Sequence, residues 1–270
     1  MKRIRCRELH ERAWCPSIFR DFLTDFLSCV WKSGVYTNAL DMIAEQMKKT
    51  GKKQMVDLCS GRGEYVPAFL AKIRKKNECG DLHAVQTDLY PHRVAFEKPA
   101  EGVEYCRESL CAEDAIKKFD GVAVMFSALH HFDEEDLERI FRTAAECNRP
   151  IAFFDVSQRR FFRDILPNIG LPVLLFLFTP FIRPWSFRRF LYTYLIPVMP
   201  VLILADGTLS RLKAYKPSEI RAIAAEVEKA YPGYRFEVGR YPLLFHLQDV
   251  TYIVGSGRTE SCSGNERNPE

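Results

Sequence analysis

Apolar residues recur at helical spacing through the first fifty residues, and short apolar runs follow them. Between residues 14 and 49 the apolar positions lie three or four apart, which predicts two amphipathic helices. Farther on, short apolar runs predict strands at 54–58, 82–87, 103–106, 121–126 and 151–155. Helical stretches follow each of the first four runs, including one after Pro91. Strands alternating with helices form a parallel sheet with helices on both faces.

The last part of the chain continues this α/β pattern. We expect a helix that follows Ser218 as its N-cap and runs to Tyr231, and an antiparallel strand pair at 234–241 and 250–255. The fold class is therefore α/β, a Rossmann-like, seven-stranded and mostly parallel sheet. The expected parts are an N-terminal helical cap (1–50), a core (51–158), an apolar helical hairpin insertion (159–213), the last helix and antiparallel edge strands (214–256) and a disordered tail (257–270).

The composition is that of an ordinary globular chain. It has 270 residues, of which 47% are hydrophobic, and a net charge of only +4, which argues against a nucleic-acid partner. Nine cysteines without a C-x-x-C pair favour reduced thiols and a cytoplasmic location over disulfides or a metal site. The first residues contain no apolar stretch of signal-peptide length, so no export is implied.

The insertion is the one region that departs from this average. Residues 165–182 and 190–205 are almost uncharged, and the basic, aromatic tip R-P-W-S-F-R-R separates them. Both stretches contain prolines and fall short of the about 20 apolar residues that a membrane-spanning helix needs. Three interpretations stay open: a buried hairpin over the active site, a hairpin that dips into a membrane, and an oligomer interface. We favour a hairpin that covers the substrate and touches an anionic membrane through residues 159–205, where Arg159, Arg160 and Arg163 add positive charge.

Candidate chemistry begins at the turn after the first predicted strand. Gly61 and Gly63 let the backbone approach a ligand closely at the carboxyl edge of the sheet. Asp88, at the end of the second strand, can accept hydrogen bonds from both hydroxyls of a ribose. The third glycine of a dinucleotide site is absent. A ligand without phosphates, with a charged amino-acid end near Asp57, therefore fits better.

Three motifs together, D-L-C-S-G-R-G, T-D-L-Y-P and S-A-L-H-H-F-D, resemble the class I S-adenosylmethionine-dependent methyltransferases over residues 52–156. The resemblance implies that the 57–63 loop holds the amino-acid part of S-adenosylmethionine, that Asp88 holds the ribose and that Leu89 packs on the adenine. The implied cofactor-binding residues are Asp57, Cys59, Ser60, Gly61, Gly63, Asp88, Leu89, Ser109, Leu110, Phe126 and Ser127. Three further segments, E-L-H-E-R-A-W, T-P-F-I-R-P-W and D-G-T-L-S-R-L-K-A-Y-K-P-S-E-I, are similar to a narrower group of such enzymes and name no substrate.

One position departs from the family pattern. Many class I methyltransferases have an acidic residue after the third strand that binds the adenine amino group, and the aligned residue here is at or near Cys111. Ser109 or a backbone carbonyl is the alternative partner. We interpret Cys59 and Cys111 as small buried residues rather than reactive thiols.

His130 and His131 follow the fourth strand, where either could act as a general base toward an acceptor. The alternative is that one of them shapes the loop while Asp133 caps the next helix. Tyr36 could cover the cofactor or pack in the core. Asp155 could orient the substrate or pair with Arg159 or Arg160.

The leading function is methyl transfer from S-adenosylmethionine to a small, hydrophobic or membrane-derived acceptor. Two alternatives remain: an enzyme that consumes the cofactor without methyl transfer, as a cyclase or lyase, and a non-catalytic, membrane-attached binding protein. The expected location is cytoplasmic, with peripheral contact at the inner membrane face.

Overall fold

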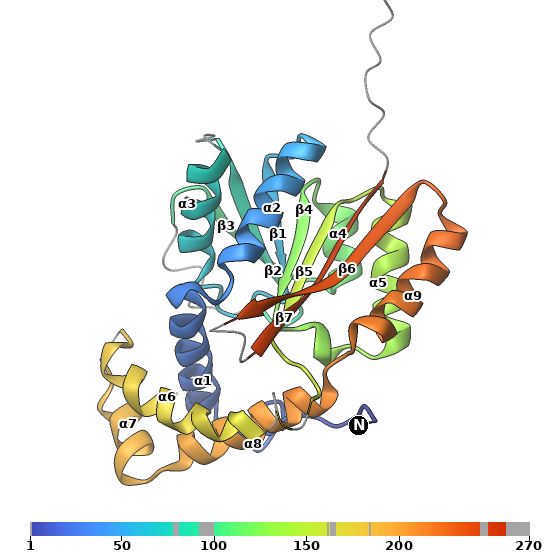
Figure 1. Cartoon of the computed structure of the whole chain (residues 1–270). Helices are drawn as coiled ribbons and strands as arrows, with labels where there is room; N and C mark the ends of the chain where they lie inside the picture. The colour runs from blue at the N-terminus through green and yellow to red at the C-terminus, as the bar shows by residue number, and fades with distance from the viewer. Residues whose placement is uncertain are drawn as a thin grey trace, which may run out of the picture.

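The computed structural model describes residues 2–77, 81–91, 100–160, 162, 166–183, 185–243 and 248–257. Its centre is one seven-stranded sheet with the order β3-β2-β1-β4-β5-β7-β6 (Figure 1). The first five strands are parallel, while β7 runs antiparallel to both β5 and β6. The strands are β1 (Gln54–Leu58), β2 (His83–Asp88), β3 (Val103–Ser109), β4 (Val122–Phe126), β5 (Ile151–Asp155), β6 (Tyr234–Leu243) and β7 (Gln248–Gly257). The predicted α/β sheet is confirmed.

Helices cover both faces of the sheet because successive residues of a buried strand point to opposite sides. Val124 packs in the core under α2 (Thr37–Thr50) and α3 (Val66–Asn77). Met125, the next residue, packs under α4 (Ala112–Lys118), α5 (Glu134–Glu146) and α9 (Pro217–Ala230). The helix expected after Pro91 and the tail after Gly257 lie outside the described residues.

The start of α9 corrects one prediction. Lys216 is the N-cap residue, and Ser218 lies inside the helix. Pro217 occupies the first helical position, where its fixed φ angle and missing N–H are tolerated. The carboxylate of Glu219 accepts a hydrogen bond from the backbone N–H of Lys216 at 2.8 Å, so the helix start is still satisfied.

The two N-terminal helices pack in different surroundings. The helix α2 covers the sheet, whereas α1 (Ser17–Val30) packs against the insertion, where Phe22 and Phe26 share a third apolar core with Leu175 and Met199. The chain changes direction between them through η1 (Trp31–Val35), where Gly34 has a φ of 114°. A side chain is strained at that angle, which explains a glycine between the two helices.

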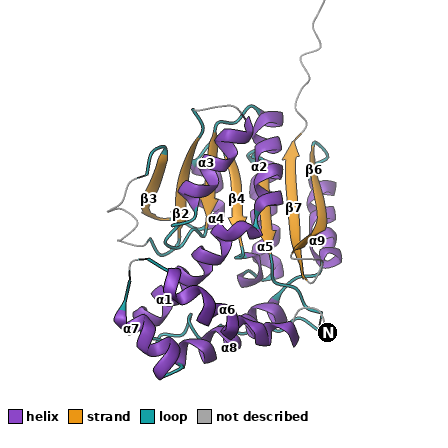
Figure 2. Ribbon diagram, turned by 60° about the vertical axis from the view of Figure 1, so that its left-hand side comes forward, coloured by secondary structure: helices purple, strands orange, loops and turns teal. Residues whose placement is uncertain are grey.

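The insertion consists of several consecutive helices, of which α8 is the longest. They are η5 (Leu166–Gly170), α6 (Leu171–Phe178), η6 (Thr179–Phe181), α7 (Phe187–Phe190), η7 (Leu191–Leu195) and α8 (Val198–Lys213). In Figure 2 the parallel strands point toward α1, α6 and α8, so the insertion lies beyond the carboxyl edge of the sheet. Among the described helices, none alone is long and apolar enough to cross a membrane. The pair Phe187–Leu195 and Val198–Lys213 meets that test jointly but is bent by 77°.

Candidate functional site

The turn after β1 is built on two glycines with left-handed backbone angles. Gly61 has a φ of 57° and Gly63 a φ of 60°. A Cβ atom at Gly63 would lie 1.7 Å from Nε2 of Gln86, which donates a hydrogen bond to the Gly63 carbonyl at 2.6 Å. At Gly61 a Cβ atom would meet nothing within 4 Å. The turn therefore needs glycine at position 63 for packing and leaves open space at position 61.

Asp57 is fully buried beneath this turn. Its Oδ2 accepts hydrogen bonds from the hydroxyls of Ser60 at 2.5 Å and Tyr65 at 2.8 Å. Its Oδ1 is buried and has no hydrogen-bond partner among the described residues. Burial raises the pKa of Asp57 to about 7, although the bonds from Ser60 and Tyr65 act in the opposite direction. A cationic ligand group beside Oδ1 would satisfy this oxygen and favour its charged form.

Asp88 lies directly beside the glycine turn. The Gly61 N–H donates a hydrogen bond to its Oδ2 at 2.8 Å, and the Tyr90 N–H donates one to its Oδ1 at 2.7 Å. The side chain of Leu89 is 48% exposed at the same edge. The structure thus brings together the two segments for which the sequence predicted a ligand site.

The segment after β3 approaches the same region. The Ser109 hydroxyl donates a hydrogen bond to the Leu89 carbonyl at 2.5 Å, and the Leu110 N–H donates one to the Asp88 carbonyl at 3.1 Å. The thiol of Cys111 donates to Oδ2 of Asp114 at 3.1 Å. Cys59 and Cys111 are half-buried rather than buried as predicted. Desolvation still raises the pKa of both thiols, which keeps them protonated and supports their interpretation as unreactive.

The end of β4 contributes backbone rather than a free side chain. The Phe126 ring is buried and lies 4.9 Å from the ring of Tyr36. The hydroxyl of Tyr36 lies 2.5 Å from Oγ of Ser127, whose φ is 49°. Tyr36 is completely buried, so it packs in the core under the site. Of the two alternatives for Tyr36, the core one is observed.

His130 is held between two carboxylates. Its Nδ1 lies 2.7 Å from Oδ2 of Asp155, and its Nε2 lies 3.5 Å from Oε1 of Glu8. Burial acts to lower the pKa of His130, but Asp155 and Glu8 outweigh it and raise the pKa to about 9. The imidazole is therefore protonated at neutral pH and has no lone pair to offer an acceptor. Its geometry suits a structural cation better than a general base.

His131 differs from His130 in both exposure and charge. Its side chain is 30% exposed, and its Nδ1 lies 2.6 Å from Oε1 of Glu11. Burial and the charge on His130 lower the pKa of His131, so its ring is neutral at physiological pH. No described residue forms a hydrogen bond with its Nε2. The loop interpretation is correct in one respect, because Asp133 accepts a hydrogen bond from the Asp136 N–H at 2.9 Å and caps α5.

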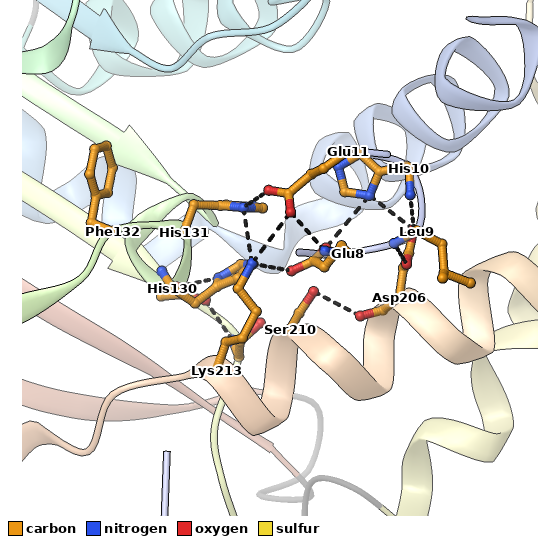
Figure 3. Close-up of polar contacts among 12 residues, drawn as sticks. Glu8, Leu9, His10, Glu11, His130, His131, Phe132, Asp206, Ser210 and Lys213 are labelled. Atoms are coloured by element: carbon orange, nitrogen blue, oxygen red, sulfur yellow. Dashed lines mark hydrogen bonds and ion pairs between the residues drawn. The ribbon is translucent and has the colours of Figure 1, made fainter. Parts of the chain in front are cut away.

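Residues from the N-terminal segment and from the end of α8 complete this cluster (Figure 3). The ammonium of Lys213, at the end of α8, lies 3.1 Å from Oε1 of Glu8 and 3.4 Å from Nδ1 of His131. Glu8 and the two histidines place three ligand-type atoms within 4.8 Å of one another, as a metal site would. The ammonium of Lys213 already lies beside Glu8 and balances the negative charge of that carboxylate, as a metal ion would. The segments E-L-H-E-R-A-W, S-A-L-H-H-F-D and D-G-T-L-S-R-L-K thus converge on one network.

The expected partners of Asp155 are wrong. Arg159 pairs with Glu219 at 2.5 Å and Arg160 with Asp249 at 2.6 Å, while Asp155 binds His130. The reason is the position of Asp155 at the end of β5, beside the loop after β4. The two arginines continue past the sheet to α9 and β7, so they cannot contribute to a basic surface on the insertion as the sequence suggested. Arg163 lies outside the described residues.

Comparison with solved structures relates this architecture to known proteins. The plantazolicin methyltransferase BamL, in complex with a desmethyl analogue and SAH, matches with a TM-score of 0.51 and 10% identity, covering 90% of this chain and 99% of that one. The plantazolicin methyltransferase BpumL matches with a TM-score of 0.50 and 12% identity, covering 90% and 88%. The chain has the class I methyltransferase fold. The chain spans 57% of the length of an O-methyltransferase family protein from Burkholderia thailandensis, at a TM-score of 0.46 and 13% identity over 84% of this chain. No protein-family model and no curated protein matches the sequence.

In this methyltransferase fold, the glycine turn and Asp88 occupy the carboxyl edge where open α/β sheets bind ligands. Sequence reasoning identified that edge and both histidines. It missed Glu8, Glu11 and Lys213, which surround the histidines. Their only signal was that they lie in the segments shared with a narrower group, and no local pattern indicated that these segments meet.

Proposed function

We propose that the protein is an S-adenosylmethionine-dependent methyltransferase. The observation that carries this proposal is the edge formed by the glycine turn, Asp57 and Asp88. An ammonium group of the cofactor's amino-acid end would satisfy the buried Oδ1 of Asp57. The open space at Gly61 admits the chain of the ligand, and Asp88 would hold the ribose. The residues present therefore fit the cofactor, and BamL and BpumL, which share the fold, were crystallised with SAH.

We extend the proposed site to the remaining predicted cofactor residues. Cys59 shapes the turn through its left-handed backbone, and Ser60 holds the Asp57 carboxylate through its hydroxyl. Leu89 offers an apolar surface to the adenine. Ser109, Leu110, Phe126 and Ser127 line the ends of β3 and β4, with the Phe126 ring committed to the core.

His131 is the group that we assign to the acceptor. When bound, S-adenosylmethionine supplies an electrophilic methyl group. Nε2 of His131 accepts the proton that an acceptor N–H or O–H loses, and Glu11 holds the ring through Nδ1. His130, which the sequence proposed as an equal candidate, acts as a positioning residue that connects this loop to Asp155 and Glu8.

The acceptor that fits best is small and hydrophobic or derived from a membrane. The apolar helices α6 and α8 lie beyond the carboxyl edge, so an acceptor that reaches His131 passes an apolar surface. We place the protein in the cytoplasm with peripheral contact at the inner membrane face, in keeping with the free thiols of its described cysteines.

Isothermal titration calorimetry with S-adenosylmethionine tests the site. Asp88→Ala is expected to weaken binding about 100-fold, since it removes charge-assisted hydrogen bonds to the ribose. Asp81→Ala is the control, because Asp81 lies before β2 and pairs with Lys53. Equal affinities of wild type and Asp88→Ala would contradict the site. Incubation with a labelled methyl donor and a lipid extract then separates transfer from binding alone, and product analysis without acceptor would reveal a cyclase or lyase.

A further inference from the structure

Exposed apolar side chains are concentrated on the insertion. Of the 17 large hydrophobic side chains that are exposed among the described residues, only Trp14, Leu89 and Tyr90 lie outside residues 162–201. The other members are Phe162, Ile169, Val173, Leu174, Phe176, Leu177, Phe181, Trp185, Phe187, Tyr194, Leu195, Ile196, Val198 and Val201. Soluble monomers rarely expose a concentration of this kind, and it marks an interaction surface.

The other side of the helices α6 and α8 packs against α1. Leu175 of α6 and Met199 and Ile203 of α8 are buried against α1. The exposed members therefore point away from the only apolar core that these helices form among the described residues. Burial under the sheet is also excluded for them, since the insertion lies beyond the edge of the sheet rather than on a face (Figure 1).

From residue 165 to 205 the charges have one sign, and Asp164, directly before this range, lies outside the described residues. No acidic residue occurs from 165 to 205. Arg183 and Arg188 are exposed beside the apolar side chains, while Arg189 turns inward to the buried Asp25 of α1. A surface that combines exposed apolar groups with only positive charge is complementary to an anionic, apolar partner.

Aromatic rings form a row at the tip. Trp185 stacks on Phe190 at 5.4 Å, Phe190 lies 4.4 Å from Tyr194, and Tyr194 lies 5.5 Å from Phe176. The Trp185 indole is 59% exposed. Tryptophan and tyrosine favour the boundary between lipid headgroups and acyl chains, because one end of each ring is polar.

We propose that the exposed apolar side chains, together with Arg183 and Arg188, form a docking face that binds the surface of an anionic lipid bilayer. The 77° bend between η7 and α8 prevents these helices from forming one straight span, so they lie in the plane of the interface. A second copy of the chain fits less well, because a symmetric pairing of this face would bring Arg183 and Arg188 toward arginines of the same kind.

Docking also explains the connection between the insertion and the histidines. The helix α8 begins at the docking face and ends at Lys213, whose ammonium contacts Glu8 beside His130. An acceptor dissolved in the bilayer would reach His131 along this helix. Only this last step rests on the proposed function, since the docking itself requires no cofactor and no acceptor.

Vesicle flotation tests the docking face. Wild type is expected to bind vesicles of phosphatidylcholine with phosphatidylglycerol, to bind pure phosphatidylcholine vesicles much more weakly, and to lose binding as salt rises. The double variant Arg183→Gln/Arg188→Gln should lower the partition coefficient about 30-fold. The matched control Lys75→Gln/Lys229→Gln removes the same charge from α3 and α9 and should bind like wild type.

A second variant tests the apolar part. Phe181→Ser/Leu195→Ser removes two exposed side chains that make no core, so folding is expected to persist by circular dichroism while vesicle binding falls. Equal binding to both kinds of vesicle, no binding to either, or a dimer that hides this face in sedimentation would overturn the proposal. Vesicle binding without calorimetric cofactor binding would overturn the proposed methyltransferase activity alone. Cofactor binding without vesicle binding would overturn the docking face and the peripheral membrane contact, and would leave the cofactor site standing.

Discussion

Nδ1 of His131 lies 2.6 Å from Oε1 of Glu11, and this contact determines which nitrogen of the ring is basic. Burial acts to raise the pKa of Glu11, but the hydrogen bonds from His131 and from the Glu8 N–H, together with the charge of Lys213, outweigh it and lower the pKa to about 2. The carboxylate is therefore ionised and can only accept, which assigns the ring proton to Nδ1, since the Lys213 ammonium makes a longer contact with that atom at 3.4 Å. Nε2 is left with a free lone pair on a neutral ring. His130, the adjacent residue, is cationic and cannot play this part.

Removing the ring of His131 should abolish most of the turnover. His131→Asn is expected to lower kcat by about 100-fold or more, the range attributed to a general base, with cofactor affinity unchanged. Steady-state kinetics and calorimetry check the two quantities. His10→Asn provides the comparison, since the His10 ring binds Asp206 in the neighbouring network at 2.9 Å. A similar loss of kcat in both variants would show that the network acts only through structure.

The pH profile distinguishes Glu11 as a positioning residue. The base acts when deprotonated, and the pKa of His131 is lowered from 6.5, so turnover should decline only at acidic pH. The hydrogen bond to Glu11 acts to raise that pKa. Glu11→Gln should therefore move the acidic limb to still lower pH while reducing the plateau. If the acidic limb of the pH profile lies at the same pH in Glu11→Gln and in wild type, Glu11 has no contact with the titrating group during turnover.

His130 should make stability depend on alkaline pH. Its pKa is about 9 in the folded protein and 6.5 without interactions. A raised pKa contributes stability that is complete below pH 6.5 and is lost as pH rises through 9. The contribution is about 3 kcal/mol or less, from ~1.4 kcal/mol per pKa unit. Urea unfolding at pH 6 and pH 9.5 should show a decline in wild type that is smaller in His130→Gln; parallel declines would contradict the assignment.

The two glycines of the turn should differ in their tolerance of alanine. Both have positive φ angles, which cost a side chain about 1 kcal/mol. Gly63→Ala adds a 1.7 Å collision with Gln86, whereas Gly61→Ala meets no atom within 4 Å. We expect Gly63→Ala to lower the free energy of unfolding by more than about 2 kcal/mol and Gly61→Ala by about 1 kcal/mol. In contrast, Gly61→Ala should weaken cofactor binding, because its side chain enters the open space. A larger loss of unfolding free energy in Gly61→Ala than in Gly63→Ala would contradict the close contact at position 63.

Asp25 should couple the glycine turn to the insertion. Its buried carboxylate pairs with Arg189 of α7 and lies 3.0 Å from Nη1 of Arg62, which stands between the two glycines. Removing one partner of a buried ion pair costs about 3–5 kcal/mol. A double-mutant cycle of Asp25→Asn and Arg189→Met, followed by urea unfolding, should show a non-additive coupling. Asp21→Asn should have a smaller effect, because the half-buried Asp21 carboxylate lies 3.9 Å from Nη1 of Arg62 and makes the longer contact with it. Additive losses would mean that the two side chains are independent.

Local sequence patterns predicted most strands of the sheet and the glycine turn with Asp88. They did not predict the residues that surround the two histidines. The strand predicted at 54–58 is β1 to the residue, and those at 151–155 and 82–87 differ from β5 and β2 by at most one residue at each end. These segments are short buried runs bounded by polar residues, so their periodicity is visible without knowledge of their neighbours. Asp88 follows from the same logic, because parallel strands end at one edge.

The start of α9 shows where local reasoning was weaker. Ser218 is a favourable N-cap residue, yet Pro217 is even better suited to the first helical position, which moves the cap back to Lys216. The two signals compete within three residues, and helix ends are the least certain part of such predictions.

The sequence by itself therefore determined the sheet, the glycine turn and the acidic residue beside it, since each depends on interactions within one short segment or one strand edge. Only the tertiary structure decided that α1 packs on the insertion, that Glu8 meets Lys213, and that His130 and His131 differ in charge. An amphipathic helix specifies which of its faces is buried but not which partner buries it. The charge of a histidine depends on carboxylates that other elements bring to it, and no spacing in the chain records that meeting.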